Sequence, residues 1–234
     1  HGRYVQVYIN GNYEGLHNLM ERPNAAFMAS YFGRDKEDYD ALNAGHAIDG
    51  DKVAWNALVA AANAQDWTAL QQTMDVENYI DYLLLSFYSG NDDWPNRNWY
   101  AARRRGDESE GFQFFAWDSE ISMDLSDRTH LRENVIRDTN NGPNGVAAAY
   151  GSLRNYDEFQ LAFADRVHQH FFNGGVFYVD PDNPDWDPAH PERNVSAARF
   201  VEAASAVSRA IVPESARWGD QHRSRPYTRN AEWQ

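Results

Sequence analysis

One segment, residues 75–89, constrains the fold more than any other part of the chain. Its apolar side chains recur at spacings of three and four, the repeat of a helix with one buried face. They are Val76, Tyr79, Ile80, Leu83, Leu84 and Phe87. Asp75 is a good N-cap, and Gly90 is a good C-terminal stop. We therefore expect a helix here, and we expect it to be the central, most buried helix.

Two β-hairpins are predicted, one before this helix and one after it. The first pairs residues 4–9 with 16–20 around the turn Asn10-Gly11-Asn12, whose residues accept positive φ. The second pairs residues 98–103 with 112–117, and residues 105–108 turn between them. Short antiparallel pairs among several helices indicate an α+β arrangement.

Four further helices are expected from apolar periodicity. Their predicted ranges are 24–32, 51–65, 155–172 and 194–211. In the second range the expected buried face holds Val53, Ala57, Leu58 and Ala61. In the last range it holds Phe200, Ala204, Val207 and Ile211. Helices therefore dominate the predicted fold.

Composition excludes several classes of function. A net charge of −14 argues against nucleic-acid binding and against a basic membrane patch, both of which need Lys and Arg. No apolar run approaches eighteen residues, so no membrane span is expected. Without cysteine there is no disulfide, thiolate nucleophile or cysteine zinc site. An acidic body remains compatible with divalent metals.

The residues that carry chemistry follow the central helix. Asp93 stands five residues before Asn98, at the start of the second hairpin, and Asp118 stands at the hairpin's far end. Protein kinases have the same order of catalytic Asp, metal-binding Asn, hairpin and metal-binding Asp. Phosphoryl transfer needs one carboxylate at the incoming hydroxyl and two oxygen ligands on magnesium. A rigid hairpin would hold these groups at a fixed distance.

This spacing by itself is not specific. Asp and Asn commonly cap and turn loops, so Asp92, Asp93 and Asn98 could simply shape the polar loop at 91–97. From the residues alone, both interpretations stay open.

Five stretches of the chain resemble the signature blocks of the spore-coat H (CotH) family of atypical protein kinases. They are YINGNYEGL at 8–16, ERP at 21–23, GNDDWPNRNW at 90–99, FAWDSE at 115–120 and ESARW at 214–218. Their order and rough spacing also match, so the similarity covers most of the chain. The resemblance implies one reduced kinase-like domain over residues 1–234, mainly a helical C-lobe, in a secreted or cell-surface protein.

The resemblance also implies the roles of individual residues. Asp93 would be the catalytic base, Asn98 a magnesium ligand and Asp118 the principal metal carboxylate. Asp92 replaces Asp93 if the register is off by one. Glu120 is either a second metal ligand or a charged strand end. ATP and Mg²⁺ are the implied cofactors, and a protein with Ser or Thr acceptors is the implied substrate.

The nucleotide-binding parts of a kinase are harder to find. The resemblance makes residues 19–22, which include Glu21, the hinge whose backbone meets adenine. Kinases also need a strand lysine and a glycine-rich loop at the phosphates. The only lysines are Lys36 and Lys52, predicted in a loop and at a helix start. We expect the chain to be part of a longer protein whose N-lobe lies upstream; otherwise an arginine substitutes, or catalysis is lost.

Three classes of function therefore remain. They are a metal-dependent Ser/Thr kinase, a catalytically silent kinase-like module for binding or adhesion, and a carbohydrate-active hydrolase. The hydrolase would pair Asp118 and Glu120 with Asp92 or Asp93. Separately, residues 180–187 contain four Asp and could bind Ca²⁺, although their prolines are also typical of a rigid surface loop.

Overall fold

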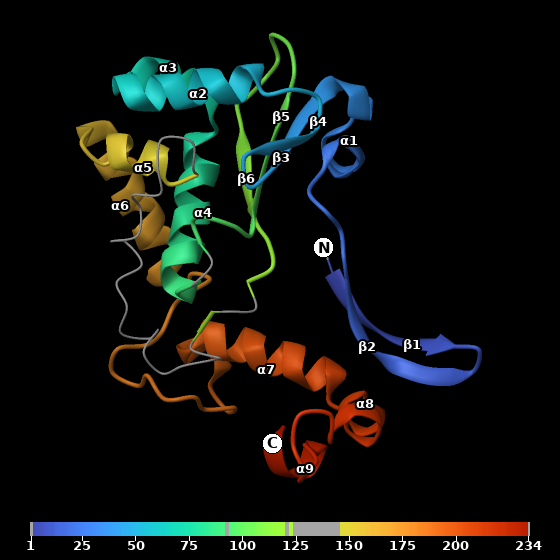
Figure 1. The fold of residues 1–234 in the computed structure, drawn as a ribbon. Coiled ribbons are helices and arrows are strands. Elements are labelled where there is room, and N and C mark those ends of the chain that lie inside the picture. The colour runs from blue at the N-terminus through green and yellow to red at the C-terminus, as the bar shows by residue number, and fades with distance from the viewer. Residues whose placement is uncertain (1, 92–93, 120–121, 124–145, 234) are drawn as a thin grey trace. The chain divides into compact units, whose positions relative to one another are not determined.

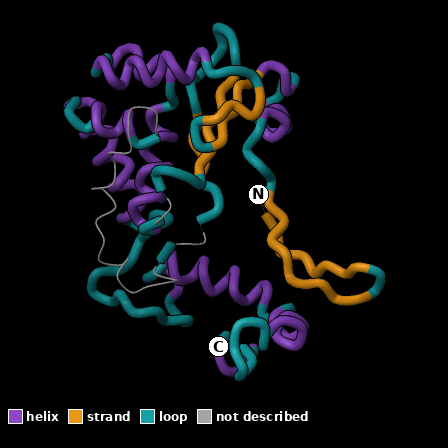
Figure 2. Tube along the Cα trace, viewed as in Figure 1, coloured by secondary structure: helices purple, strands orange, loops and turns teal. Residues whose placement is uncertain are grey.

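The structure is a computed structural model that describes residues 2–91, 94–119, 122–123 and 146–233. It combines helices with two antiparallel sheets (Figures 1 and 2), which confirms the predicted α+β class. The chain forms two compact units. We call residues 22–168 the sheet unit, and residues 1–21 together with 169–234 the hairpin unit. No helix in the described ranges is both long enough and apolar enough to cross a membrane.

The sheet unit holds most of the helices and a four-stranded sheet. Its elements are α1 (Ala25–Phe32), β3 (Tyr39–Asn43), β4 (His46–Asp49), α2 (Val53–Ala64), α3 (Trp67–Thr73), α4 (Val76–Ser89), β5 (Trp99–Arg104), β6 (Gln113–Ala116), α5 (Ala148–Leu153) and α6 (Asp157–Phe171). The end of α6, from Gln169 on, belongs to the hairpin unit.

The predicted second hairpin is present as β5 and β6, but it is only half of a sheet. The strand order is β4-β3-β5-β6, with every neighbouring pair antiparallel. In register, Leu42 of β3 lies opposite Ala101 of β5, which in turn lies opposite Phe114 of β6. The expectation of isolated strand pairs was therefore wrong for this hairpin.

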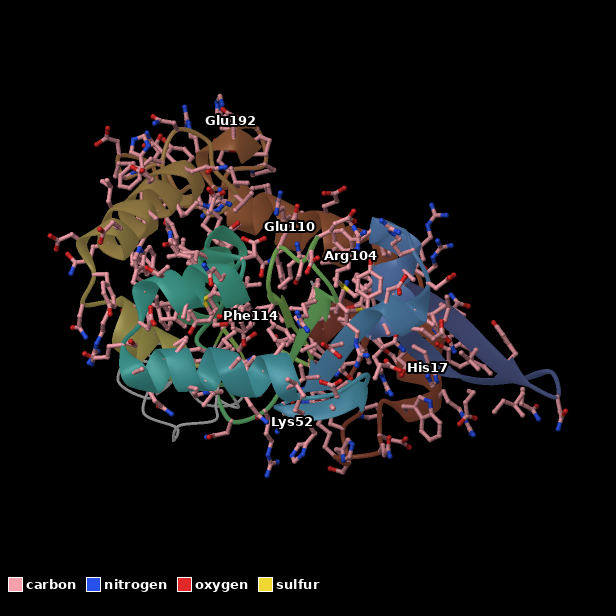
Figure 3. The ribbon with its side chains drawn as sticks, turned by 90° about the horizontal axis from the view of Figure 1, so that it is seen from above. His17, Lys52, Arg104, Glu110, Phe114 and Glu192 are labelled. Carbon is pink, nitrogen blue, oxygen red and sulfur yellow. The ribbon has the colours of Figure 1, made fainter. Side chains whose placement is uncertain are left out.

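Helices cover both faces of the sheet. On one face, Phe27 of α1 packs edge-on against Phe115, with ring centroids 5.7 Å apart. On the other, Phe114 contacts Tyr79 of α4 at 4.8 Å and Trp55 of α2 at 6.4 Å. Figure 3 shows Phe114 in this layer between α4 and the hairpin. Because adjacent residues of a strand point to opposite faces, helices cover Phe114 and Phe115 from opposite sides, whereas Ala116 at the end of β6 is exposed.

Helix α4 is the central helix that the periodicity predicts. The Asp75 side chain caps its first turn by accepting from Asn78 N at 3.0 Å, and Gly90 ends it at a positive φ of 59°. Leu83 is fully buried and Leu84 nearly so. The expected boundaries are confirmed. Of the expected face, Tyr79, Ile80, Leu83 and Leu84 are buried and Val76 and Phe87 are half-buried, while Tyr82 and Ser86 are buried as well.

Strand β6 is fastened to the start of α4. Asp75 N donates to Phe112 O at 3.0 Å, and Phe112 N donates to Thr73 O at 2.9 Å. Two residues further on, Phe114 N donates to the Asn78 side-chain oxygen at 2.6 Å. These bonds pin the hairpin to the helix by its main chain.

Such a close approach requires glycine at residue 111. A Cβ on Gly111 would lie 2.5–2.6 Å from backbone atoms of Met74, well inside van der Waals contact. Gly111 also has a φ of 86°, which L side chains rarely adopt. Any side chain here would push β6 away from α4.

A buried charge network joins the other strands. Asp40 of β3 is 1% exposed, and its carboxylate pairs with Arg103 at 3.0 Å and Arg105 at 2.6 Å. It also accepts from Asp51 N at 3.0 Å. A Cβ on Gly50 would lie 2.3 Å from this carboxylate, so glycine leaves the space that it occupies. The hydrogen bond that Arg105 donates to Asp40 raises the pKa of Arg105, consistent with a permanent ion pair.

Helix α6 is tied to α4 by an ion pair. Arg166 donates to both oxygens of Asp81, with Nε 2.7 Å from Oδ1, and it also reaches Glu77. Phe159 is the buried residue of α6. The helix is thus held by an apolar face and by a bidentate arginine–carboxylate ion pair.

The hairpin unit contains the predicted first hairpin and three C-terminal helices. Its elements are β1 (Gly2–Ile9), β2 (Asn12–Met20), α7 (Val195–Val207), α8 (Ile211–Trp218) and α9 (Arg229–Glu232). Asn194 caps α7 by accepting from Ala197 N at 3.0 Å.

Helix α8 clamps the first hairpin across about 200 residues of sequence. Glu214 accepts from Leu16 N at 2.7 Å and from the Tyr13 hydroxyl at 2.8 Å, and Trp218 Nε1 donates to Glu14 O at 2.7 Å. The blocks at 8–16 and 214–218, which the CotH resemblance quotes separately, therefore lie together in this unit.

Several expectations were wrong in detail. The pair β3–β4, helix α3 and helix α5 were not predicted, and the range 194–211 is divided between α7 and α8. In α2 the buried face is set by Trp55, Leu58 and Val59, whereas Val53 is 74% exposed. Phe200 of α7 is also exposed. The sequence also predicts a polar, irregular segment at about 119–144, and most of it lies outside the described residues.

The burial of α4 gives a first prediction. Leu83→Ala should lower the free energy of unfolding by about 2–5 kcal/mol, because it leaves a cavity in a packed core. Leu85→Ala is the matched control, because Leu85 lies on the same helix but is 39% exposed. It should lower the free energy of unfolding much less. Urea unfolding measures both. Equal small losses would mean that α4 is peripheral.

The clamp gives a second prediction, in alkaline solution. Burial, together with the hydrogen bond and charge of Glu214, raises the pKa of Tyr13 from 10.0 to about 12. Because the folded pKa exceeds the unfolded one, this stabilisation is complete below pH 10 and is lost as the pH rises towards 12. Tyr13→Phe, which cannot ionise, should lose less stability than the wild type over this range in urea unfolding. Tyr4→Phe, on an exposed part of the hairpin, serves as control.

Candidate functional site

The loop that follows α4 is held by two tryptophans. Trp94 Nε1 donates to the Tyr82 hydroxyl at 2.6 Å, and the Trp94 ring meets Phe87 edge-on at 5.5 Å. Trp99 Nε1 donates to Pro95 O at 3.1 Å. Burial raises the pKa of Tyr82, so its phenol stays neutral and accepts this bond. The segment that leads to Asn98 is thereby fixed against the helix.

Asn98 and Asp118 lie together at the open end of the β5–β6 hairpin. The Asn98 Nδ2 donates to Asp118 O at 2.8 Å, and Trp117 N donates to Asn98 O at 3.2 Å. Both residues have positive φ, 59° for Asn98 and 50° for Asp118. Asn and Asp tolerate this left-handed region better than other side chains, yet it still costs about 1–2 kcal/mol per residue. The hairpin bonds hold the backbone there.

This pair supplies the kind of atoms that magnesium binds. Asn98 carries an amide oxygen, and Asp118 contributes an exposed carboxylate. Magnesium usually takes one or two protein carboxylates and fills its other positions with water and phosphate oxygens. In the parts of the chain that the structure describes, no three His, Asp or Glu side chains form a metal-binding group.

A pocket of about 260 Å³ lies beside Asn98, between the C-terminal half of α4 and the end of the hairpin. Asn91, Asn98 and Ser119 are among its polar lining residues, and Leu85 and Ala116 among its apolar ones. Asp118 is not among the residues that line it. The volume of this pocket is slightly smaller than that of a typical small-molecule pocket, about 300–1,000 Å³.

The remaining predicted site residues are Asp92, Asp93, Glu120 and Glu21. Asp92, Asp93 and Glu120 lie outside the described residues. Glu21 is exposed and directly follows β2. The chain passes from the hairpin unit to the sheet unit between Glu21 and Arg22, within the predicted hinge.

The two lysines lie where the sequence predicts. Lys36 opens a 3₁₀ turn at Lys36–Asp38, and Lys52 is the N-cap residue of α2 (Figure 3). Neither is on a strand, as a phosphate-binding kinase lysine would be. Arg103 and Arg105, two arginines near the end of β5 that could replace such a lysine, form ion pairs with Asp40.

The aspartates of the predicted calcium loop serve the loop itself. Asp180 accepts from Asp182 N at 3.0 Å and from the Asn183 side chain at 3.2 Å, and Asp187 accepts from Ala189 N at 2.9 Å. The backbone bond from Asp182 lowers the pKa of Asp180. These contacts are those of a rigid, self-bonded surface loop.

Sequence reasoning missed two polar residues beside the pair. Asn91 is buried, and its Nδ2 donates to Ser119 Oγ at 3.2 Å. Both residues stand inside the quoted blocks at 90–99 and 115–120, but an Asn after a helix and a Ser after a strand carry no local signal of this contact. Their distance in sequence hides it.

Comparisons of the chain with protein-family models, with curated proteins and with solved structures return no match. The likeness to the CotH family therefore rests on the five sequence blocks.

The pairing of Asn98 with Asp118 gives a third prediction. Asp118→Asn should weaken magnesium-dependent ATP binding at least about ten-fold, since it removes the anionic ligand. Asn also tolerates the positive φ of residue 118, so the fold should survive. Asp107→Asn makes the same change in the turn at the hairpin's other end and should leave binding intact. Unchanged affinity of Asp118→Asn in calorimetry would contradict the assignment.

Proposed function

We propose that this chain is an ATP- and magnesium-dependent phosphotransferase of the CotH kind, acting on Ser or Thr of secreted or cell-surface proteins. The pairing of Asn98 with Asp118 carries the proposal. These residues are 20 apart in sequence, yet their hydrogen bond of 2.8 Å places both expected metal ligands at one end of a rigid hairpin. A loop that only turned the chain would not require ligand-type atoms on both strands.

The chemistry assigns one further role. Magnesium held by Asn98 and Asp118 would neutralise charge on the nucleotide phosphates. Asp93, five residues before Asn98, would orient the incoming hydroxyl and accept its proton. The hydroxyl oxygen bonds to the γ-phosphorus, the bond from that phosphorus to the bridging oxygen breaks, and ADP leaves.

Residues 19–22 are the expected hinge of the proposed kinase fold. The boundary between the hairpin unit and the sheet unit falls after Glu21, within this range.

A fourth prediction separates the catalytic base from the metal ligand. A base acts on the attacking hydroxyl and contributes little to holding ATP, whereas a metal ligand contributes to both. Asp93→Ala should therefore keep the ATP and Mg²⁺ affinities within about three-fold while phosphate transfer falls by about 10²–10⁴. Asp92→Ala is the neighbouring control and should be much milder. Calorimetry and radiolabel transfer to a Ser-rich protein measure the two properties.

The remaining outcomes distinguish the alternatives. If Asp92→Ala is inactive and Asp93→Ala is active, the kinase proposal stands with the register moved by one. If the wild type binds ATP and Mg²⁺ without transferring phosphate, the chain is a silent kinase-like binding module. If it binds no nucleotide but cleaves glycosides, the hydrolase interpretation replaces the proposal.

A further inference from the structure

Asn91 is a buried polar residue. It is 5% exposed and follows directly after Gly90, the C-cap of α4, so its backbone is anchored to the end of a rigid helix. A buried amide without partners would cost about 1–3 kcal/mol. Among its contacts, Asn91 Nδ2 donates to Ser119 Oγ at 3.2 Å.

Ser119 is the residue after Asp118, and Ser122 and Met123 also make hydrogen bonds in this region. Ser122 Oγ donates to Ser119 O at 2.7 Å, and Met123 N donates to Ser89 O at 2.8 Å. Of these hydrogen bonds, the one between Asn91 and the Ser119 side chain involves the residue directly after Asp118. It connects the Asp118 turn to the helix rather than to the hairpin.

Asp118 is therefore held from two sides. On its N-terminal side, Trp117 N is bonded to Asn98 O, and Asn98 Nδ2 is bonded to Asp118 O. On its C-terminal side, Ser119 is bonded to Asn91. A residue at a φ of 50° stays there only when its surroundings hold it. With both neighbours bonded, the backbone from which the Asp118 carboxylate extends is fixed.

We propose that Asn91 is a positioning residue that aims the Asp118 carboxylate through Ser119. This inference rests on the proposed metal role of Asp118. A metal ligand must be held within about 0.5 Å of its working position, and residues behind the ligands usually supply that precision. Asn91 does so by fixing the Asp118 turn to the same helix end that fixes the loop of Trp94 and Asn98.

The fifth prediction tests this with a double-mutant cycle. Asn91→Ala and Ser119→Ala should each weaken Mg²⁺ binding about ten-fold, as losses behind a metal ligand do. The Mg²⁺ affinity of the double variant should be no lower than that of the single variant with the lower affinity, because both substitutions remove the same bond. Ser119→Thr keeps a hydroxyl and should bind like the wild type. The probe is Mg²⁺ in the presence of ATP, measured by calorimetry on the whole chain.

Asn78→Ala is the matched control. It removes a side-chain bond of 2.6 Å to Phe114 N, on the same hairpin but away from Asp118. It should lower stability without changing Mg²⁺ affinity. If Asn91 only stabilised the fold, Asn91→Ala would behave in the same way, and the proposal would be wrong.

A second measurement keeps this inference separate from the proposed function. Hydrogen exchange at the Trp117 amide reports the Asp118 turn without any metal, and Asn91→Ala should speed it about five-fold or more relative to the Ala101 amide in β5. If the wild type binds no Mg²⁺ but this acceleration is seen, the metal role fails while the positioning role stands. Unchanged exchange together with unchanged or additive affinities would overturn the positioning role.

Discussion

The sheet unit depends on how closely strand β6 approaches the start of helix α4. Gly111 permits main-chain contact with Met74, and the bonds at Phe112 and Phe114 then hold the strand against the start of the helix. The chain after β6 reaches the other end of the helix, where Ser119 bonds to Asn91.

The buried Asp40 carboxylate is a second constraint on the same hairpin. An uncompensated charge in this position would cost several kcal/mol, so β3 is compatible with the core only while Arg103 and Arg105 reach it. Both arginines belong to the end of β5 and the turn after it. The main-chain bonds of Phe112 to the start of α4 lie at this same end, and the Arg103 guanidinium stands over the Phe112 ring, 5.8 Å from its centroid. Charge and the fit to α4 thus hold the turn end of the hairpin together, and the proposed metal ligands lie at its other, open end.

The parts of the fold that the sequence predicts are those whose signals are local. Helix α4 has a complete apolar face with Asp75 and Gly90 at its ends, and the hairpin β5–β6 has a turn between two strand-like runs. Strand β3 was missed because it places an aspartate in the core, which makes sense only with arginines more than sixty residues away. The face of α2 was misjudged because its many alanines leave the choice to Trp55, whose aromatic partners lie on β5 and β6. Asn91 and Ser119 were missed for the same reason.

The candidate site shows why residue types alone could not separate a turn from a ligand set. Asn and Asp are at once the side chains that best tolerate positive φ and two of the oxygen donors that magnesium accepts, so Asn98 and Asp118 satisfy both descriptions. What distinguishes the descriptions is the placement of the pair. A turn needs favourable residues on one short segment, whereas here two segments twenty residues apart meet through an Asn side chain. The Asn91 amide then bonds to Ser119, the residue after Asp118. Tolerance of strain explains each residue alone. The magnesium ion proposed above would give a reason for two such oxygen-bearing residues to meet at the end of the hairpin.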